Sequence, residues 1–70
     1  MNKIKRYNRI KAVLADSGKS NKEIAEHFKI QEETVSRWMS NKAQPSLQRL
    51  FELAEFLDVD VRTLIVSNKS

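Results

Sequence analysis

The sequence contains no cysteine, and its 70 residues include a single glycine and a single proline. Without cysteine, the chain has neither a disulfide framework nor a thiolate zinc site to compensate for a small core. With so few turn-forming residues, and with no segment that alternates polar and apolar positions, the chain has little that would form hairpin strands. These absences favour an all-α fold that is held together by apolar packing.

Long hydrophobic runs are also missing. The longest apolar stretch, Val59 to Val66, is interrupted by Asp60, Arg62 and Thr63. It falls far short of the roughly 20 apolar residues that a membrane span requires. The N-terminus lacks the apolar centre of a signal peptide. We therefore expect a cytoplasmic protein with no membrane partner.

The sequence has little that could carry catalysis. His27 is the only histidine, and a lone histidine without cysteines makes a poor metal site. No nucleophile–base pair and no glycine-rich phosphate loop is recognisable. We expect no enzymatic activity, no cofactor and no metal, and we interpret His27 as a structural residue. The length predicts a single domain over residues 1–70, with its core at about 7–66 and a frayed tail at 67–70.

Positive charge is unevenly distributed within the net charge of +4. Residues 1–20 contain one acidic residue, Asp16, whereas residues 21–45 balance basic against acidic side chains. The basic residues of the first segment are Lys3, Lys5, Arg6, Arg9, Lys11 and Lys19. A polyanion would meet this half of the chain first. The alternative is a solvated basic face that only keeps the protein in solution.

Apolar spacing of three and four residues predicts helices along the first half of the chain. The first helix is expected from about Lys3 to Ser17, before Gly18, with a buried stripe of Tyr7, Ile10, Val13 and Leu14. Ser20 and Glu23 form a capping-box pattern, which predicts that the second helix starts at Asn21. A third helix is expected from Glu32 to Ser40.

Two further helices are predicted in the second half. Ser46 can cap a fourth helix, which Asp58 ends, and Asp60 can cap a short fifth helix. The fourth helix is expected to bury one side that consists of Leu47, Leu50, Phe51, Ala54 and Leu57. The fifth is expected to bury Val61, Leu64 and Ile65.

The segment from Asn21 to Ser40 has the pattern of a helix-turn-helix. Two helices joined by so short a turn cross at about 90–120°, and their close approach requires a small side chain, here Ala25. The apolar cluster around Ala25 consists of Ile24, Phe28, Ile30, Val35 and Trp38. We interpret Trp38 as an anchor of the core.

These residues resemble the Xre/Cro family of phage-repressor-like helix-turn-helix domains. The resemblance is carried by Ser20 to Ala25, by Thr34 to Trp38 and by Pro45 to Leu47, and it extends from about Arg9 to Val66. It implies a compact five-helix, lambda-repressor-like domain whose third helix enters the major groove of double-stranded DNA. The implied function is a sequence-specific regulator of transcription, a repressor, that acts as a dimer. The alternative is the antitoxin of a toxin–antitoxin pair, which binds a toxin protein and its own operator.

The resemblance implies which side chains face base edges. These are Gln31, Glu32, Glu33, Ser36, Arg37 and Ser40. Arg37 can donate twice to guanine, or it can instead pair with Glu33 one turn earlier. Gln31 can read adenine, or it is only a poor helix cap. The two glutamates can accept from cytosine, or they only complement the helix dipole.

Phosphate contacts are expected from the start of the second helix and from the loop after the third. The candidates are Lys19, Asn21, Lys22, Thr34, Asn41 and Lys42. For each lysine, a solvated surface position is the alternative. The expected homodimer seam is the C-terminal helix region, with Val59, Val61, Leu64, Ile65 and Val66. The alternative is that these residues complete the core of a monomer.

The sequence departs from the family at two kinds of position. Lys29, Asn41 and Asp58 stand at helix ends where the family usually has glycine. If they adopt the left-handed conformation, Lys29 should cost about 1 kcal/mol. Family members also often join the first helix to the end of the third by an Arg–Glu pair, and here Leu14 and Met39 hold those places. We interpret this change as an apolar contact that replaces an ionic one.

Overall fold

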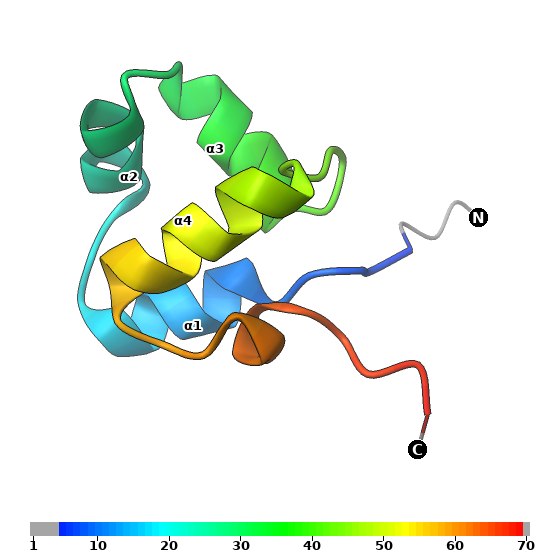
Figure 1. Cartoon of the computed structure of the whole chain (residues 1–70). Coiled ribbons are helices and arrows are strands. Elements are labelled where there is room, and N and C mark those ends of the chain that lie inside the picture. Colours follow the sequence, from blue (N-terminus) through cyan, green and yellow to red (C-terminus); the bar gives the residue numbers. More distant parts are fainter. Residues whose placement is uncertain (1–4, 70) are drawn as a thin grey trace.

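A computed structural model describes residues 5–69 as four α-helices followed by a single 3-10 turn (Figure 1). The elements are α1 (Ile10–Ser17), α2 (Asn21–Phe28), α3 (Glu32–Met39), α4 (Leu47–Leu57) and η1 (Val61–Leu64). No strand occurs between residues 5 and 69, so the all-α prediction is confirmed there. The expectation of five helices is matched only in part, because the short fifth element, η1, is a 3-10 helix and not an α-helix. None of the described helices is long and apolar enough to cross a membrane.

The first helix is shorter than predicted. It begins at Ile10, not near Lys3. Its N-cap residue, Arg9, makes no side-chain capping bond, but the side-chain oxygen of the preceding Asn8 accepts from the Ile10 backbone N–H at 3.0 Å. Residues 5–9 are not helical, and Asn8 forms an isolated antiparallel bridge with Ile65. Tyr7 therefore lies exposed, not in the buried stripe. The predicted residues 3 and 4 lie outside the described part of the chain.

The predicted caps of the other helices are present. The Ser20 hydroxyl accepts from the Glu23 N–H at 3.1 Å, and the Glu23 carboxylate accepts from the Ser20 N–H at 2.8 Å, which completes the capping box. Ser46 caps α4 through the Arg49 N–H. Asp60 caps η1 through the Arg62 N–H, and hydrogen bonds from the Arg62 side chain and backbone lower the pKa of Asp60 to about 2.

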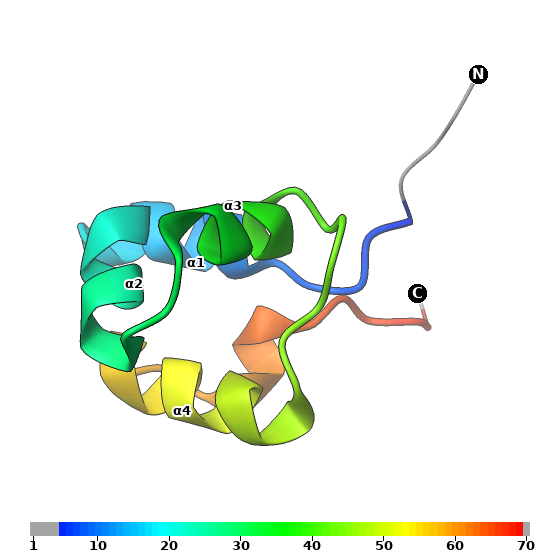
Figure 2. The ribbon, with the colours of Figure 1, turned by 90° about the horizontal axis from the view of Figure 1, so that it is seen from above.

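The helices surround one apolar core (Figure 2). α2 packs against α3, α4 packs against η1, and α1 contacts both α3 and η1. The fully buried side chains are those of Ile10, Ile24, Val35, Leu53 and Leu64. Trp38 and Ala25 are also buried, as the sequence predicted. The core thus joins the two helices of the helix-turn-helix to every other element.

α4 buries part of the predicted face, namely Leu50, Ala54 and Leu57, and adds Leu53 to it. Leu53, Ala54 and Leu57 are buried, and Leu50 packs against them from a half-buried position. These four residues follow the spacing of one helical stripe. Leu47 and Phe51 lie beside that stripe and are 72% and 53% exposed. The expectation that both would be buried was wrong.

Three helix ends have the left-handed backbone that glycine adopts most easily, at the places where the resemblance to the Xre/Cro family implies glycine. The φ angles are 58° at Lys29, 62° at Asn41 and 58° at Asp58. Lys29 ends α2, and its N–H donates to the Ala25 carbonyl. Gly18, with φ of 77°, ends α1 in the same way. Lys29 is the side chain least suited to this conformation.

Lys29→Gly should therefore stabilise the protein. We expect a gain of about 1 kcal/mol, because glycine removes the steric cost of the left-handed backbone and the exposed lysine leaves no cavity. The gain should appear as a rise in melting temperature by circular dichroism. Lys22→Gly, in the first turn of α2, removes the same charge from a helical position and is the matched control; it should lower the melting temperature. A lower melting temperature for Lys29→Gly would contradict the expectation.

Candidate nucleic-acid interface

α2 and α3 form a helix-turn-helix whose geometry is set by the turn between them. The turn runs over Lys29, Ile30 and Gln31, and the Ile30 N–H donates to the Ala25 carbonyl at 3.0 Å. Ile30 packs against the core from a half-buried position. Because Val35 is fully buried, α3 is fixed on the core by one side and presents the other side to solvent.

The predicted base-contacting residues lie on that free side. All six side chains are exposed, namely those of Gln31, Glu32, Glu33, Ser36, Arg37 and Ser40. The Gln31 side chain makes no capping hydrogen bond, and α3 begins directly after it. The Ser40 hydroxyl donates to the Arg37 carbonyl at 3.2 Å and closes the other end of the helix. One polar strip thus runs along the whole length of α3.

Arg37 is not held by a neighbouring acid. The ion pairs within residues 5–69 are Arg49–Glu52 and Asp60–Arg62, and neither involves Arg37 or Glu33. Glu33 therefore does not form an ion pair with the Arg37 guanidinium in this structure. Glu32 and Glu33 both stand in the first turn of α3, where their charge complements the positive helix end.

Some of the predicted phosphate-contacting residues border the same surface. The Asn21 side-chain amide at the start of α2 lies 3.4 Å from the Ser36 hydroxyl on α3, which brings the two predicted sets together. Lys22 follows Asn21 and is exposed, and Thr34 is half-buried. After α3, the Lys42 N–H donates to the Arg37 carbonyl at 2.9 Å, so only the ammonium of Lys42 remains for a phosphate.

The remaining two phosphate candidates have internal contacts. The Lys19 ammonium lies 5.1 Å from the centre of the Phe56 ring, toward α4. Asn41 is 7% exposed, and its side-chain oxygen accepts from the N–H groups of Tyr7 and Asn8 at 2.8 and 3.0 Å. The Asn41 N–H itself donates to the Trp38 carbonyl. Both residues therefore have structural roles that their surroundings in the sequence did not indicate.

Two side chains that the sequence did not single out, the buried Asn8 and the exposed Gln44, form a hydrogen-bond network with Asn41. The Asn8 amide donates to the Trp38 carbonyl at 3.0 Å and to the Gln44 side chain at 2.7 Å. The Asn41 amide donates to the Asn8 carbonyl at 3.2 Å. We call Asn8, Asn41 and Gln44 the asparagine clasp. It ties residues 7 and 8 to the loop that follows α3. The one available signal was Asn8 itself, since an asparagine before an apolar stripe can mark a helix start.

His27 takes part in an aromatic cluster. Its ring stacks on Phe56 with 4.2 Å between ring centres and meets the edge of Phe28 at 4.7 Å. The Arg49 guanidinium lies over the Phe28 ring, 4.5 Å from the centre of that ring. Among the described residues, no three histidine, aspartate or glutamate side chains gather closely enough to hold a metal ion. His27 thus contributes to the packing of α2 on α4.

The predicted dimer seam is only partly on the surface. Leu64 is fully buried, and Val59 and Val61 pack against the core from half-buried positions, so these three complete the core of a single chain. Including Leu64 in the seam was wrong. Ile65 and Val66 remain exposed. Among residues 5–69, the other large exposed apolar side chains are those of Tyr7 and of Leu47 and Phe51 on α4. α4 packs against η1.

Comparison with known proteins agrees with this geometry. A helix-turn-helix family matches residues 10–64, which include all four α-helices and η1. The chain is also similar to a crystallographically solved protein of Bacteroides fragilis, described as a candidate DNA-binding protein. The identity is 50%, the TM-score is 0.85, and the match covers 89% of this chain and 100% of the other. No curated protein matches the sequence. The family match and the exposed polar face of α3 together identify this chain as a member of the Xre-like helix-turn-helix family.

Proposed function

We propose that this protein is a sequence-specific DNA-binding repressor of transcription whose α3 enters the major groove. The observation that carries the proposal is the exposed polar strip of α3, which the buried Val35 and Trp38 hold rigidly on the core. The described DNA-binding character of the similar Bacteroides fragilis protein supports it. The antitoxin function stays a prediction, which co-purification with a toxin would test.

Within this strip, each kind of side chain has a distinct role. Arg37 donates to guanine in the major groove, and Gln31, Ser36 and Ser40 contact neighbouring base edges. Glu32 and Glu33 accept from cytosine amino groups and repel other sequences. Phosphates on either side are contacted by Asn21, Lys22, Thr34 and Lys42, which flank the strip. We leave Lys19 and Asn41 out of this set because of their internal contacts.

A comparison of Arg37→Ala with Lys42→Ala distinguishes recognition of bases from binding of phosphates. A selection of bound duplexes from random DNA first supplies the preferred site. We expect Arg37→Ala to lose about 1–3 kcal/mol on that site and to relax the preference at one base pair. Lys42→Ala should weaken preferred and random duplexes alike and reduce the salt dependence of binding. Equal losses for Arg37→Ala on preferred and random DNA would contradict the role of α3.

We further propose that the protein binds its operator as a dimer, with half-sites about 34 Å apart. One domain of this size buries little DNA-facing surface, so a second copy is needed for tight and selective binding. The exposed apolar side chains of Leu47, Phe51, Ile65 and Val66 form the contact. Sedimentation on the selected duplex should give two chains per site, and Phe51→Glu should give one. A wild-type protein that binds as a single chain would reject the dimer.

A further inference from the structure

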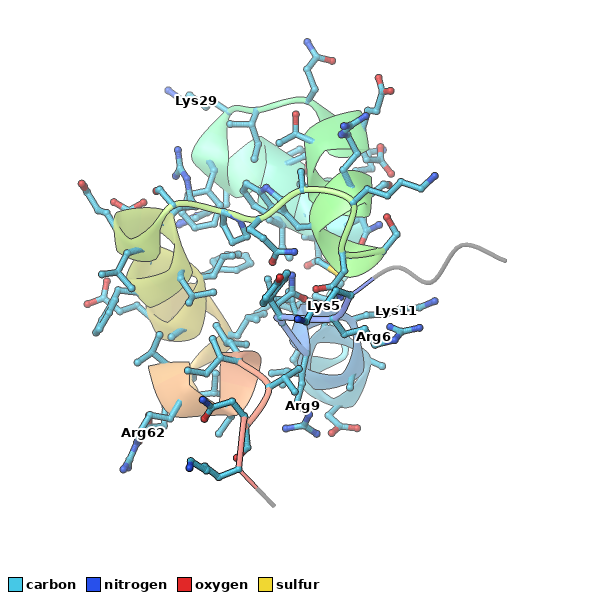
Figure 3. The ribbon with its side chains drawn as sticks, turned by 90° about the vertical axis from the view of Figure 1, so that its right-hand side faces the viewer. Lys5, Arg6, Arg9, Lys11, Lys29 and Arg62 are labelled. Carbon is cyan, nitrogen blue, oxygen red and sulfur yellow. The ribbon has the colours of Figure 1, made fainter. Side chains whose placement is uncertain are left out.

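Three exposed basic side chains lie where the N-terminal segment meets α1. Lys5 and Arg6 precede the asparagine clasp, and Lys11 is the second residue of α1 (Figure 3). We call these three residues the N-terminal basic cluster. Within the described residues, none of them forms an ion pair with a carboxylate. Arg9 differs, because its guanidinium donates to the Thr63 carbonyl at 3.3 Å near η1.

The basic cluster borders the end of α3. Arg6 and Lys11 line one shallow groove together with Met39, the last residue of α3, and Asn41, which follows it. The groove has a volume of about 420 Å³. Lys42, which we assign to a phosphate, comes next in the chain. The cluster is thus adjacent to the loop that approaches the DNA backbone.

The asparagine clasp holds the cluster in this place. Asn41 accepts from the backbone of Tyr7 and Asn8, so the residue directly after Arg6 is hydrogen-bonded to the loop after α3. Asn8 is 5% exposed, which shields these bonds from water. In the sequence, Arg6 stands shortly before Asn8 of the clasp and Lys11 shortly after it. Both are therefore attached to a rigid part of the molecule.

We propose that Arg6 and Lys11, with Lys5, bind DNA phosphates beyond those reached by α2 and by the loop after α3, and that the asparagine clasp positions them. The inference rests on the proposed DNA binding and extends its footprint. Unpaired cations beside a phosphate-contacting loop would release further counterions on binding, which makes the affinity more sensitive to salt. The phosphate contacts carry no base preference, so the cluster strengthens binding to every sequence.

The test measures affinity against salt concentration for random-sequence DNA duplexes. Arg6→Gln/Lys11→Gln should reduce the slope of log K against log salt by about 2, because each phosphate contact contributes about 0.9. The control Lys29→Gly/Arg62→Gln removes the same charge from positions away from the cluster and should change the slope little (Figure 3). Melting temperatures confirm that each variant is folded. Equal slopes for the two double variants would overturn the proposal.

Asn41→Gly tests the role of the clasp separately. Glycine accepts the backbone angle of 62° but cannot bond to Tyr7 or Asn8, so all basic residues are kept while their anchor is lost. We expect the slope to fall toward that of Arg6→Gln/Lys11→Gln. A wild-type slope would overturn the positioning role.

If the wild-type protein selects a site that depends on Arg37, yet the cluster variant keeps the wild-type slope, this inference fails while the proposed function stands. If the wild-type protein binds no duplex, both fail.

Discussion

Leu14→Arg should destabilise the protein by about 3 kcal/mol or more, because it places an unpaired charge in the core between α1 and α3. Leu14 and Met39 are each 6% exposed and belong to the same apolar cluster. α1 also packs directly on α3. For a domain of this size, the loss corresponds to a fall in melting temperature on the order of 15 °C.

The control restores the Arg–Glu pair that family members often have at the positions of Leu14 and Met39. Met39→Glu alone should also destabilise, whereas Leu14→Arg/Met39→Glu should recover much of the loss, since the two charges then neutralise each other. Thermal unfolding of the wild type and the three variants closes a double-mutant cycle. A favourable coupling would show that the two positions interact. Additive losses, or an unchanged melting temperature for Leu14→Arg, would mean that they do not.

Asn41→Ala should cost about 4 kcal/mol, the second large effect that we expect. The substitution removes the acceptor for the Tyr7 and Asn8 N–H groups and the donor to the Asn8 carbonyl, each bond contributing about 1 kcal/mol. It also imposes a left-handed backbone on alanine, which costs roughly 1 kcal/mol. Because Asn8 is buried, water cannot easily replace the lost partners.

Asn41→Gly divides this cost into its two parts. Glycine loses the same hydrogen bonds but adopts the backbone angle freely, so it should be more stable than Asn41→Ala by about 1 kcal/mol. Urea unfolding of both variants measures the difference. Asn41→Asp keeps an acceptor but loses the amide donor to Asn8, and should fall between glycine and the wild type. Wild-type stability in Asn41→Gly would mean that the clasp contributes nothing to the fold.

The two large effects have different origins in the sequence. The Leu14 and Met39 positions follow from apolar spacing and from the resemblance to the Xre/Cro family. The role of Asn41 could not be read in that way. Its expected role was a phosphate contact on a polar loop, whereas its side chain is buried against a segment 33 residues earlier in the chain.

Features that depend on near neighbours were determined by the sequence itself. The starts of α2 and α3 were correct to the residue, because a capping box and an apolar stripe involve positions only three or four apart. The pairing of α2 with α3 is local in the same sense, since the short turn and the small Ala25 restrict how the two helices can cross. The left-handed backbone at Lys29, Asn41 and Asp58, in contrast, was suggested only by the resemblance to the family, which usually has glycine there.

Other features were decided only by tertiary structure. α1 begins at Ile10 because Asn8 is held by Asn41 and Gln44, and an extended partner at Ile65 stops the helix from continuing toward the N-terminus. The exposure of Leu47 and Phe51 depends on which side of α4 meets the other helices, and the apolar pattern fits either choice. Hydrogen bonds across 30 or more residues leave no periodic signal in the sequence, because their partners become neighbours only when the core has formed.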